Sequence, residues 1–178
     1  MNFIETKLKD CFIVEPDIFT DERGFFLESY NKKKYRKILD ESIDFVQDNH
    51  SQSSKGVLRG MHIQKNNQQG KLVRVTRGKV LDIAVDCRKE STSYGKWESV
   101  ILTEKNKRQF WIPPGFAHGF LVLSDNTDLM YKCTGYYDPA DEIAFKWDDP
   151  DLMISWPIEN PILSEKDRVA KPFRDLKL

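Results

Sequence analysis

The sequence predicts an all-β sandwich or barrel, with a jelly roll as the leading version and a few short helices. Segments in which apolar and polar residues alternate recur along the chain, separated by Gly, Pro, Asn and Asp at near-regular spacing. Before the C-terminal region, apolar residues fall at helical spacing in one segment only. No repeat, linker or low-complexity stretch divides the chain, so we expect a single domain over residues 1–178.

About ten short strands are expected from this alternation. They include Cys11–Pro16, Phe25–Tyr30, Val57–Gln64, Lys71–Val75, Gly78–Asp86, Trp97–Leu102, Gln109–Ile112, Gly119–Leu123 and Leu129–Thr134. In Gly78–Asp86 the alternation predicts a strand that is buried on one face only. Pro, Gly and Asp predict turns at Asp17–Gly24 and Pro113–Gly119. A helix is predicted at Asn31–Asp40, with Asn31 as its N-cap.

Composition argues against several classes of function. The 28 basic and 28 acidic residues cancel, so no overall field would attract nucleic acid or a membrane surface. The three cysteines are far apart and form no C-x-x-C pair, so neither a zinc site nor a disulfide framework is indicated. The first residues lack the apolar segment of a secretory signal, and no apolar run has the length of a membrane span. We therefore expect a cytoplasmic protein.

Polar residues interrupt the apolar pattern in the stretch Gln47–Arg77. Strict alternation along Val57–Gln64 places Arg59 on one face of the strand and His62 on the other, and Lys71 opens the next strand. Burying these groups without partners would be costly, whereas a bound polar ligand would satisfy them. The stretch therefore predicts a pocket lined by polar residues.

His62 is a candidate for acid–base chemistry. A metal site is disfavoured, because the residue two positions after His62 is Gln64 rather than a second histidine. A histidine that acts as a base at neutral pH usually needs a carboxylate on its other ring nitrogen. Asp167, Asp48 and Asp82 are all open candidates, since spacing alone does not choose among them.

Three further residues have both a plain and a functional interpretation. Tyr131 is expected on a strand, where it is either packed in the core or a general acid. Arg23, in an expected turn, is by default a solvated charge. His118 is expected in the Pro/Gly turn that precedes a strand, and is open to either interpretation.

Longer blocks of the sequence resemble one family. The segments FTDERGFFLESY, FVQDNHSQSSKGVLRGMHIQ, QGKLVRVTRGKVLDIAVDCR, IPPGFAHGFLVLSD, YKCTGYYDPADE, WDDPDLMISWP and LSEKDR are similar to those of the dTDP-4-dehydrorhamnose 3,5-epimerases. The resemblance runs in order from about Cys11 to Asp167, nearly the whole chain. It implies a cupin-type jelly roll that forms a homodimer and works without a metal or another cofactor.

The resemblance also implies a reaction. The substrate would be dTDP-4-dehydro-6-deoxy-D-glucose, whose C4 ketone makes the protons at C3 and C5 acidic. The product would be dTDP-4-dehydro-L-rhamnose, in dTDP-L-rhamnose biosynthesis. His62 corresponds to the base that removes the proton to give an enolate, and Asp167 to the carboxylate that orients this base. Lys71 would stabilise the charge on the C4 oxygen, and Tyr131 would return a proton on the opposite face.

A wider set of residues falls at ligand positions of the family. Arg59 matches a diphosphate-binding residue, and Arg23 matches another that reaches across the dimer. Phe26 and Tyr137 match positions that pack against the thymine and deoxyribose. The other matching positions are Glu28, Gln47, Asp48, Asn49, His118, Glu142 and Lys166.

Other functions are compatible with parts of this pattern. A related enzyme would epimerise only C3 or only C5 of a nucleotide-linked 4-keto-6-deoxy sugar. A non-catalytic sugar-binding cupin would have no need for the combination of His62, Asp167, Lys71 and Tyr131. A metal-dependent cupin would contain bound metal and lose activity with a chelator.

Overall fold

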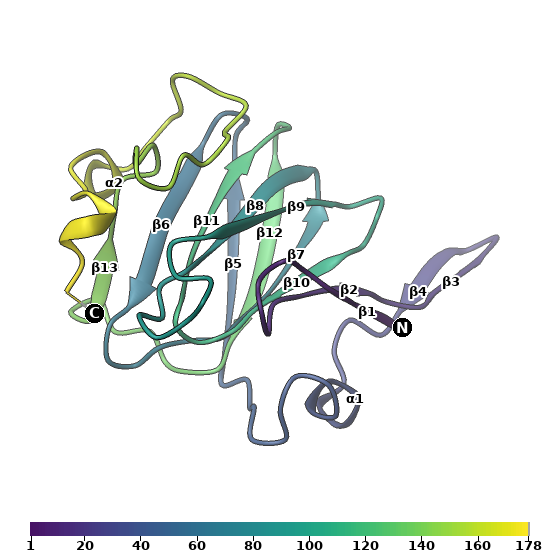
Figure 1. The fold of residues 1–178 in the computed structure, drawn as a ribbon. Coiled ribbons are helices and arrows are strands. Elements are labelled where there is room, and N and C mark those ends of the chain that lie inside the picture. Colours follow the sequence, from purple (N-terminus) through teal and green to yellow (C-terminus); the bar gives the residue numbers. More distant parts are fainter. Residues whose placement is uncertain (178) are drawn as a thin grey trace.

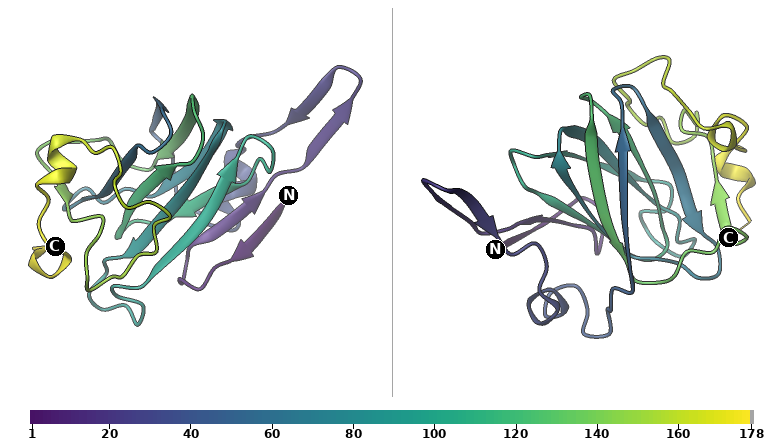
Figure 2. Two further views of the ribbon diagram at one scale, coloured as in Figure 1. Left: turned by 90° about the horizontal axis from the view of Figure 1, so that it is seen from above. Right: turned by 180° about the vertical axis from the view of Figure 1, so that it is seen from behind.

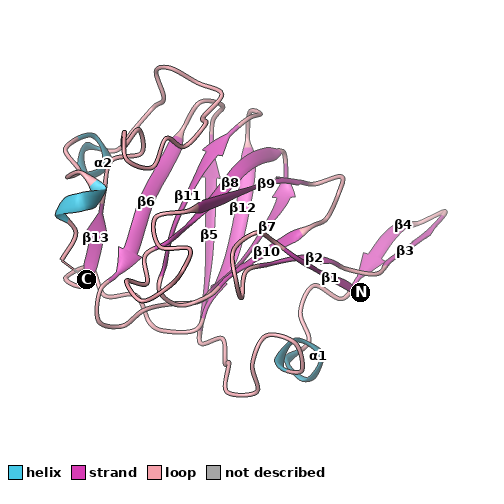
Figure 3. Ribbon diagram, viewed as in Figure 1, coloured by secondary structure: helices cyan, strands magenta, loops and turns pink. Residues whose placement is uncertain are grey.

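Two antiparallel sheets form the body of the molecule, which a computed structural model describes for residues 1–177 (Figure 1). The larger sheet contains, in spatial order, β1 (Asn2–Glu5), β2 (Phe12–Glu15), β10 (Gln109–Ile112), β7 (Lys71–Arg77), β12 (Thr127–Cys133) and β5 (Gln47–Ser53). The smaller sheet contains β13 (Glu142–Ala144), β6 (Leu58–Gln64), β11 (Phe116–Val122), β8 (Lys79–Asp86) and β9 (Trp97–Thr103). These strands and the few short helices confirm the predicted all-β class (Figure 3).

The main core lies between the two sheets. Inward-facing residues of β7 and β10 in the larger sheet pack against those of β8, β9 and β11 in the smaller one. Each fully buried aliphatic or aromatic side chain contributes about 1.5–3 kcal/mol, so this layer stabilises the sandwich. The buried residues include Val73, Val75, Val80, Ala84, Leu102, Phe110, Ile112, Phe116, Phe120 and Val122.

A second core covers the outer face of the smaller sheet. Leu81, Ile83 and Val85 of β8 pack there against Phe145 and Phe173 of the C-terminal segment. Every residue of β8 after Lys79 is therefore buried, which corrects the prediction of a strand buried on one face only. Alternation showed the apolar face correctly, but it could not show that residues distant in sequence would cover the other side.

A β-hairpin occupies the segment for which the sequence predicted a turn. β3 (Ile18–Asp21) pairs with β4 (Gly24–Leu27), and only Glu22 and Arg23 form the loop between them. The strand predicted at Phe25–Tyr30 thus begins one residue earlier and ends three residues earlier. The hairpin projects away from the sandwich (Figure 2). Its exposed apolar side chains are Ile18, Phe19, Phe25 and Phe26.

The helices are shorter than predicted or were not predicted. α1 (Lys32–Arg36) begins after Asn31, whose side chain accepts a hydrogen bond from the Lys34 N–H, so the predicted N-cap is confirmed. The predicted helix continued to Asp40, whereas α1 ends at Arg36. Its residue Tyr35 is buried against the outer face of the larger sheet. The short helices α2 (Glu165–Arg168) and η1 (Phe173–Asp175) lie near the C-terminus.

Candidate active site

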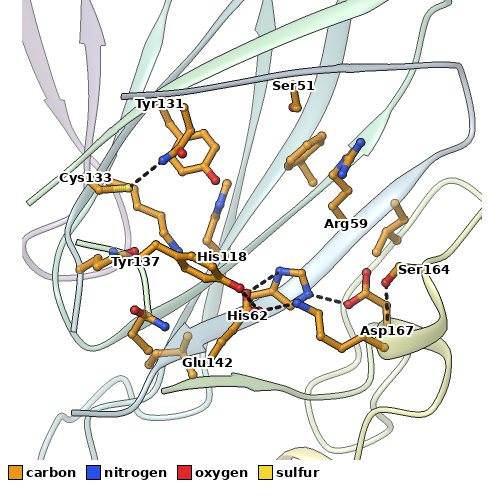
Figure 4. Close-up of a pocket in the computed structure, with 18 of the residues that line it drawn as sticks. Ser51, Arg59, His62, His118, Tyr131, Cys133, Tyr137, Glu142, Ser164 and Asp167 are labelled. Atoms are coloured by element: carbon orange, nitrogen blue, oxygen red, sulfur yellow. Dashed lines mark hydrogen bonds and ion pairs between the residues drawn. The ribbon is translucent and has the colours of Figure 1, made fainter. Parts of the chain in front are cut away.

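A cavity of about 630 Å³ lies between the two sheets. The larger sheet lines it from β5, β7 and β12, and the smaller sheet from β6 and β11 (Figure 4). Its lining is rich in polar groups, as the central stretch of the sequence predicted. The polar and charged lining residues are Gln47, Asn49, Ser51, Arg59, His62, Gln64, Gln69, Lys71, His118, Tyr131, Tyr137, Glu142, Ser164, Lys166 and Asp167.

A β-bulge in β6 brings Arg59 and His62 to the same side of the strand. His62 pairs with His118 of β11 and Arg59 pairs with Phe120, so three residue steps on β6 (59 to 62) face two steps on β11 (118 to 120). The extra residue reverses the alternation of side chains. The prediction that Arg59 and His62 lie on opposite faces was therefore wrong, since both line the cavity.

Two glycines allow β6 and β11 to approach closely at this bulge. Gly60 has a φ of +129°, and a Cβ atom there would lie 2.5 Å from the Cα atom of Gly119. A Cβ atom on Gly119 would lie 2.5 Å from Met61 Sδ and 3.0 Å from the carbonyl oxygen of Arg59. A side chain at either position would therefore push the strands apart and displace Arg59 and His62.

His62 and Asp167 form a hydrogen-bonded pair, although 105 positions separate them in the sequence. Nε2 of His62 lies 2.5 Å from Oδ1 of Asp167, whose side chain is 2 % exposed. Ser164 caps α2 and accepts a hydrogen bond from the Asp167 N–H at 3.2 Å, which fixes this carboxylate in place. Burial opposes its ionisation, but hydrogen bonds from His62, Ser164 and the Gly60 N–H outweigh burial. The net effect lowers the pKa of Asp167.

The other ring nitrogen of His62 faces a second group of charges. Nδ1 lies 3.6 Å from Oε1 of Glu142, and Oε2 of Glu142 accepts a hydrogen bond from the Tyr137 hydroxyl at 3.0 Å. Lys166 also pairs with Glu142. Burial disfavours the charged form of Glu142, but Lys166, His62 and Tyr137 stabilise it and lower its pKa overall. Since Nε2–H donates to Asp167, the lone pair of a neutral His62 is on Nδ1.

Lys71 and Tyr131 reach the cavity from the larger sheet. Tyr131 lies across the cavity from the His62–Asp167 pair (Figure 4). Burial raises the pKa of Tyr131 to about 12, so its hydroxyl keeps its proton at neutral pH. Burial lowers the pKa of Lys71, although the nearby Cys133 and Glu142 oppose this shift. The Lys71 ammonium group makes no hydrogen bond or ion pair with any of residues 1–177, which leaves it available to a ligand.

His118 lies on β11 and not in the turn that the sequence predicted. The Pro/Gly turn is shorter than expected, because the strand already begins at Phe116. Nε2 of His118 is 3.0 Å from both carboxylate oxygens of Asp82, a buried residue of β8. Asp82 is therefore the partner of His118 and not of His62, which removes it from the three candidates for the His62 carboxylate.

Arg59 is held by a serine that the sequence did not single out. Nε and Nη2 of Arg59 donate to the Ser53 hydroxyl at 3.3 and 3.2 Å, and the guanidinium lines the cavity. Gln47, on the same strand as Ser53, accepts a hydrogen bond from the Tyr137 N–H at 2.9 Å. Its amide also donates to the side-chain oxygen of Asn49 at 3.0 Å. The polar face of β5 thus orders both the guanidinium and the Tyr137 segment.

Four predicted ligand residues lie outside this cavity. Asp48 points to the other face of β5 and pairs with Lys132 at 2.9 Å, so it does not contact His62 either. Glu28 pairs with Lys34 near α1. Arg23 and Phe26 are on the projecting β3–β4 hairpin, where the Phe26 side chain is 69 % exposed. Within a single chain these four residues therefore do not reach His62.

Several cavity residues were missed by the sequence reasoning. Ser51 continues the two-residue repeat of Gln47 and Asn49, and this repeat was the available signal. The Ser51 hydroxyl is the one buried side-chain polar atom in residues 1–177 without a hydrogen-bond partner. The other missed polar residues are Gln64, Gln69, Cys133 and Ser164. The Gln64 side chain donates a hydrogen bond to the Asp138 carbonyl and accepts one from the Asp138 N–H.

Residues 1–177 contain neither a metal-binding cluster nor a membrane-spanning helix. Within residues 1–177, no group of three or more His, Cys, Asp or Glu side chains has the arrangement to hold a metal ion. The helices of the same region lack the length and apolar character that crossing a membrane requires.

Comparison with known proteins identifies the family. The family model described as dTDP-4-dehydrorhamnose 3,5-epimerase matches residues 5–175. The dTDP-4-dehydrorhamnose 3,5-epimerase of Shigella flexneri is 51 % identical over 176 residues, covering 98 % of this chain and 97 % of the relative. That of Methanothermobacter thermautotrophicus is 51 % identical over 176 residues, covering 97 % and 95 %.

A solved structure gives the same answer. The dTDP-6-deoxy-D-glucose-3,5-epimerase of Legionella pneumophila, in complex with dTDP-4-keto-L-rhamnose, superimposes with a TM-score of 0.96 at 51 % sequence identity. The match covers 99 % of this chain and 94 % of that chain. The chain therefore belongs to the dTDP-4-dehydrorhamnose 3,5-epimerase family, with the cupin-type jelly roll and the isomerase class that the sequence predicted.

Proposed function

We propose that the cavity binds dTDP-4-dehydro-6-deoxy-D-glucose and inverts C3 and C5 to give dTDP-4-dehydro-L-rhamnose. The observation that carries this proposal is the arrangement of acid–base groups on opposite walls. The His62–Asp167 pair comes from the smaller sheet and α2, and Tyr131 comes from the larger sheet. An epimerase needs this arrangement, because the proton must leave one face of the carbon and return on the other.

The first step is proton removal by His62. The C–H bond next to the ketone breaks, the proton moves to Nδ1 of His62, and the electron pair forms an enolate with its charge on the C4 oxygen. Asp167 holds the ring in the tautomer with a free Nδ1 lone pair and stabilises the imidazolium that forms. Lys71, which has no ion-pair partner among residues 1–177, is placed to stabilise the enolate oxygen.

The second step returns a proton from the opposite wall. Tyr131 donates its hydroxyl proton to the carbon, and solvent then restores both groups by taking the proton from the His62 imidazolium and returning one to the Tyr131 phenolate. The raised pKa of Tyr131, about 12, keeps the donor protonated between turnovers at neutral pH. It also makes the phenolate basic enough to regain its proton from water without delay.

The nucleotide end of the substrate is assigned to the cationic and aromatic side chains of the cavity. Arg59, oriented by Ser53, offers paired N–H donors to the diphosphate. Tyr137, whose backbone is held by Gln47, offers an aromatic face to the thymine. These two residues leave the His62 end of the cavity to the sugar.

The functional unit is proposed to be a homodimer in which the β3–β4 hairpin enters the cavity of a second copy. The hairpin exposes Phe19, Phe25 and Phe26 at 63, 57 and 69 % while it projects from its own chain. Large apolar side chains gathered on one short exposed hairpin are typical of a contact surface. Transfer to a second copy would bring Arg23 and Phe26 to a cavity that they do not reach within their own chain.

A mixing experiment tests the dimer. Arg23→Ala and His62→Ala homodimers should each be inactive. After unfolding and refolding together, one site of each mixed dimer has His62 from one chain and Arg23 from the other, which gives about a quarter of wild-type activity. If Arg23 acted on its own chain, no mixed site would be complete and no activity would return.

Proton NMR in deuterated water tests the reaction. The substrate is incubated with the protein, and the product is trapped by a 4-keto-reductase. Deuterium at both C3 and C5 is expected. Label at a single carbon would identify the C3-only or C5-only epimerase, and no label would reject this substrate or this activity.

A further inference from the structure

A second histidine–carboxylate pair lies in the cavity wall. Asp82 of β8 and His118 of β11 are 0 % and 7 % exposed, and Nε2 of His118 is 3.0 Å from each oxygen of Asp82. The Asp82 carboxylate has no other hydrogen-bond partner among residues 1–177. His118 lines the cavity, and its second nitrogen, Nδ1, forms no hydrogen bond within the same residues.

The number of protons that the pair carries decides what His118 offers to a ligand. If two protons are shared, the pair is either Asp82 carboxylate with His118 imidazolium or neutral carboxylic acid with neutral imidazole. Nδ1 bears a proton in both forms, since Nε2 faces Asp82. If one proton is lost, Nε2–H still donates to Asp82, and Nδ1 becomes a bare acceptor.

Burial favours the pair with two protons. Losing a proton would leave a net negative charge on two side chains that are almost wholly buried, which low-dielectric surroundings disfavour. Burial also raises the pKa of Asp82 in spite of the opposing influence of His118 and Lys71. The environment therefore retains protons on the pair.

The charged and titratable neighbours do not reverse this conclusion. His62 lies opposite His118 on β6, and Tyr131 of β12 has its ring centroid 6.3 Å from that of His118. Lys71 of β7 is the nearby cation, but it makes no ion pair with Asp82. The other titratable groups that line the cavity are Arg59, Cys133, Tyr137, Glu142, Lys166 and Asp167.

We propose that Asp82 is a positioning residue that holds His118 as an N–H donor, so that His118 Nδ1 and Lys71 together receive the enolate oxygen of the substrate. The inference rests on the proposed epimerase function. Lys71 extends from the larger sheet and His118 from the smaller one, so the two donors approach the cavity from opposite walls. Two preorganised donors on a developing oxyanion stabilise it more than a single ammonium does.

The protonation state of His118 tests the pair without any substrate. Nitrogen-15 NMR of histidine-labelled protein at neutral pH should show a proton on His118 Nδ1, and His50→Gln and His118→Gln variants assign the three histidine signals. A bare Nδ1 in the wild-type protein would overturn the proposal. This readout does not depend on turnover, so it remains decisive even if the proposed reaction is wrong.

Asp82→Ala tests the effect on turnover. Alanine leaves His118 without the carboxylate that fixes its ring and shares its proton, so kcat should fall about 10²–10³-fold, as on removal of one oxyanion-hole donor. Affinity for dTDP, which lacks the sugar, should be unchanged. A folded variant that binds dTDP and retains wild-type kcat would overturn the proposal.

Asp86→Ala is the matched control. Asp86 is on the same strand and equally buried, but it accepts hydrogen bonds from Arg88, Ser91 and Ser93 and does not line the cavity. Its replacement should lower stability and leave kcat unchanged. An equal loss of kcat in both variants would show a general effect of removing a β8 carboxylate and would overturn the specific role of Asp82.

Discussion

Asp167→Asn should remove most of the turnover and leave the fold and nucleotide binding intact. Asparagine has the same shape as aspartate, and its N–H can still donate to the Ser164 hydroxyl that caps α2. The change removes the negative charge 2.5 Å from His62 Nε2. It also allows the new amide to turn and donate to Nε2, which moves the ring proton to Nδ1 and occupies the lone pair needed for the reaction.

The magnitude follows from these two effects. A hydrogen bond between charged groups contributes about 1.5–3 kcal/mol, and its loss from the imidazolium state slows the reaction about 10- to 150-fold. The same substitution in a Ser-His-Asp triad, where the wrong tautomer also forms, costs about 10⁴-fold. We therefore expect kcat to fall by about 10- to 10⁴-fold, with the larger value if the amide donates to Nε2.

Deuterium incorporation at C3 and C5 measures this loss directly, and calorimetry with dTDP checks that the cavity is intact. Glu165→Gln is the matched control, because Glu165 is on the same helix, 75 % exposed, and pairs only with Arg168 at the surface. It should behave as wild type. If Asp167→Asn retained exchange within about threefold of wild type, Asp167 would not orient the base.

Three further perturbations test other parts of the site. Arg59→Ala should weaken dTDP binding about 10- to 100-fold by calorimetry, since it removes a charge-assisted contact to phosphate, and an unchanged Kd would contradict that contact. Tyr131→Phe should abolish one phenol titration near pH 12 in the ultraviolet spectrum. Because this pKa is raised in the folded state, the stability that Tyr131 contributes is present below pH 10 and lost as the pH rises towards 12, and the variant should lack this loss. Gly60→Ala should destabilise the fold by about 1–3 kcal/mol more than Gly24→Ala in urea denaturation, because both glycines have positive φ but only Gly60 would clash with β11; equal losses would refute the close approach.

Apolar alternation predicted the strands that form the walls of the core. These strands are stabilised by burial of apolar side chains, and such side chains recur at every second position in the sequence. It failed for β5 (Gln47–Ser53), whose inward face is polar because it lines the cavity rather than the core. The strand β3 was missed for a related reason. It was assigned to a turn because Asp21–Gly24 has the composition of a turn, and all four residues of β3 are exposed, so no pattern of burial marks it in the sequence.

The bulge at Gly60 shows a different limit. Faces assigned by strict alternation assume that each residue of β6 pairs with one residue of the next strand, and the extra residue breaks this rule. The sequence does contain Gly60 at the bulge, but a glycine within a strand does not indicate which of the neighbouring side chains change face. The consequence is large, because it places Arg59, the proposed phosphate ligand, on the same side of β6 as His62, the proposed base.

The choice among three carboxylates shows why spacing could not assign the partner of His62. Asp48 is next to a cavity-lining residue of β5 and therefore points to the opposite face, where it meets Lys132. Asp82 faces inward, but β11 lies between β8 and β6, so it stands two strand spacings from His62, about 10 Å, and meets His118 instead. Asp167 is not on a strand at all. It reaches His62 because the C-terminal segment folds back over β6, so only the three-dimensional path of the chain identifies it.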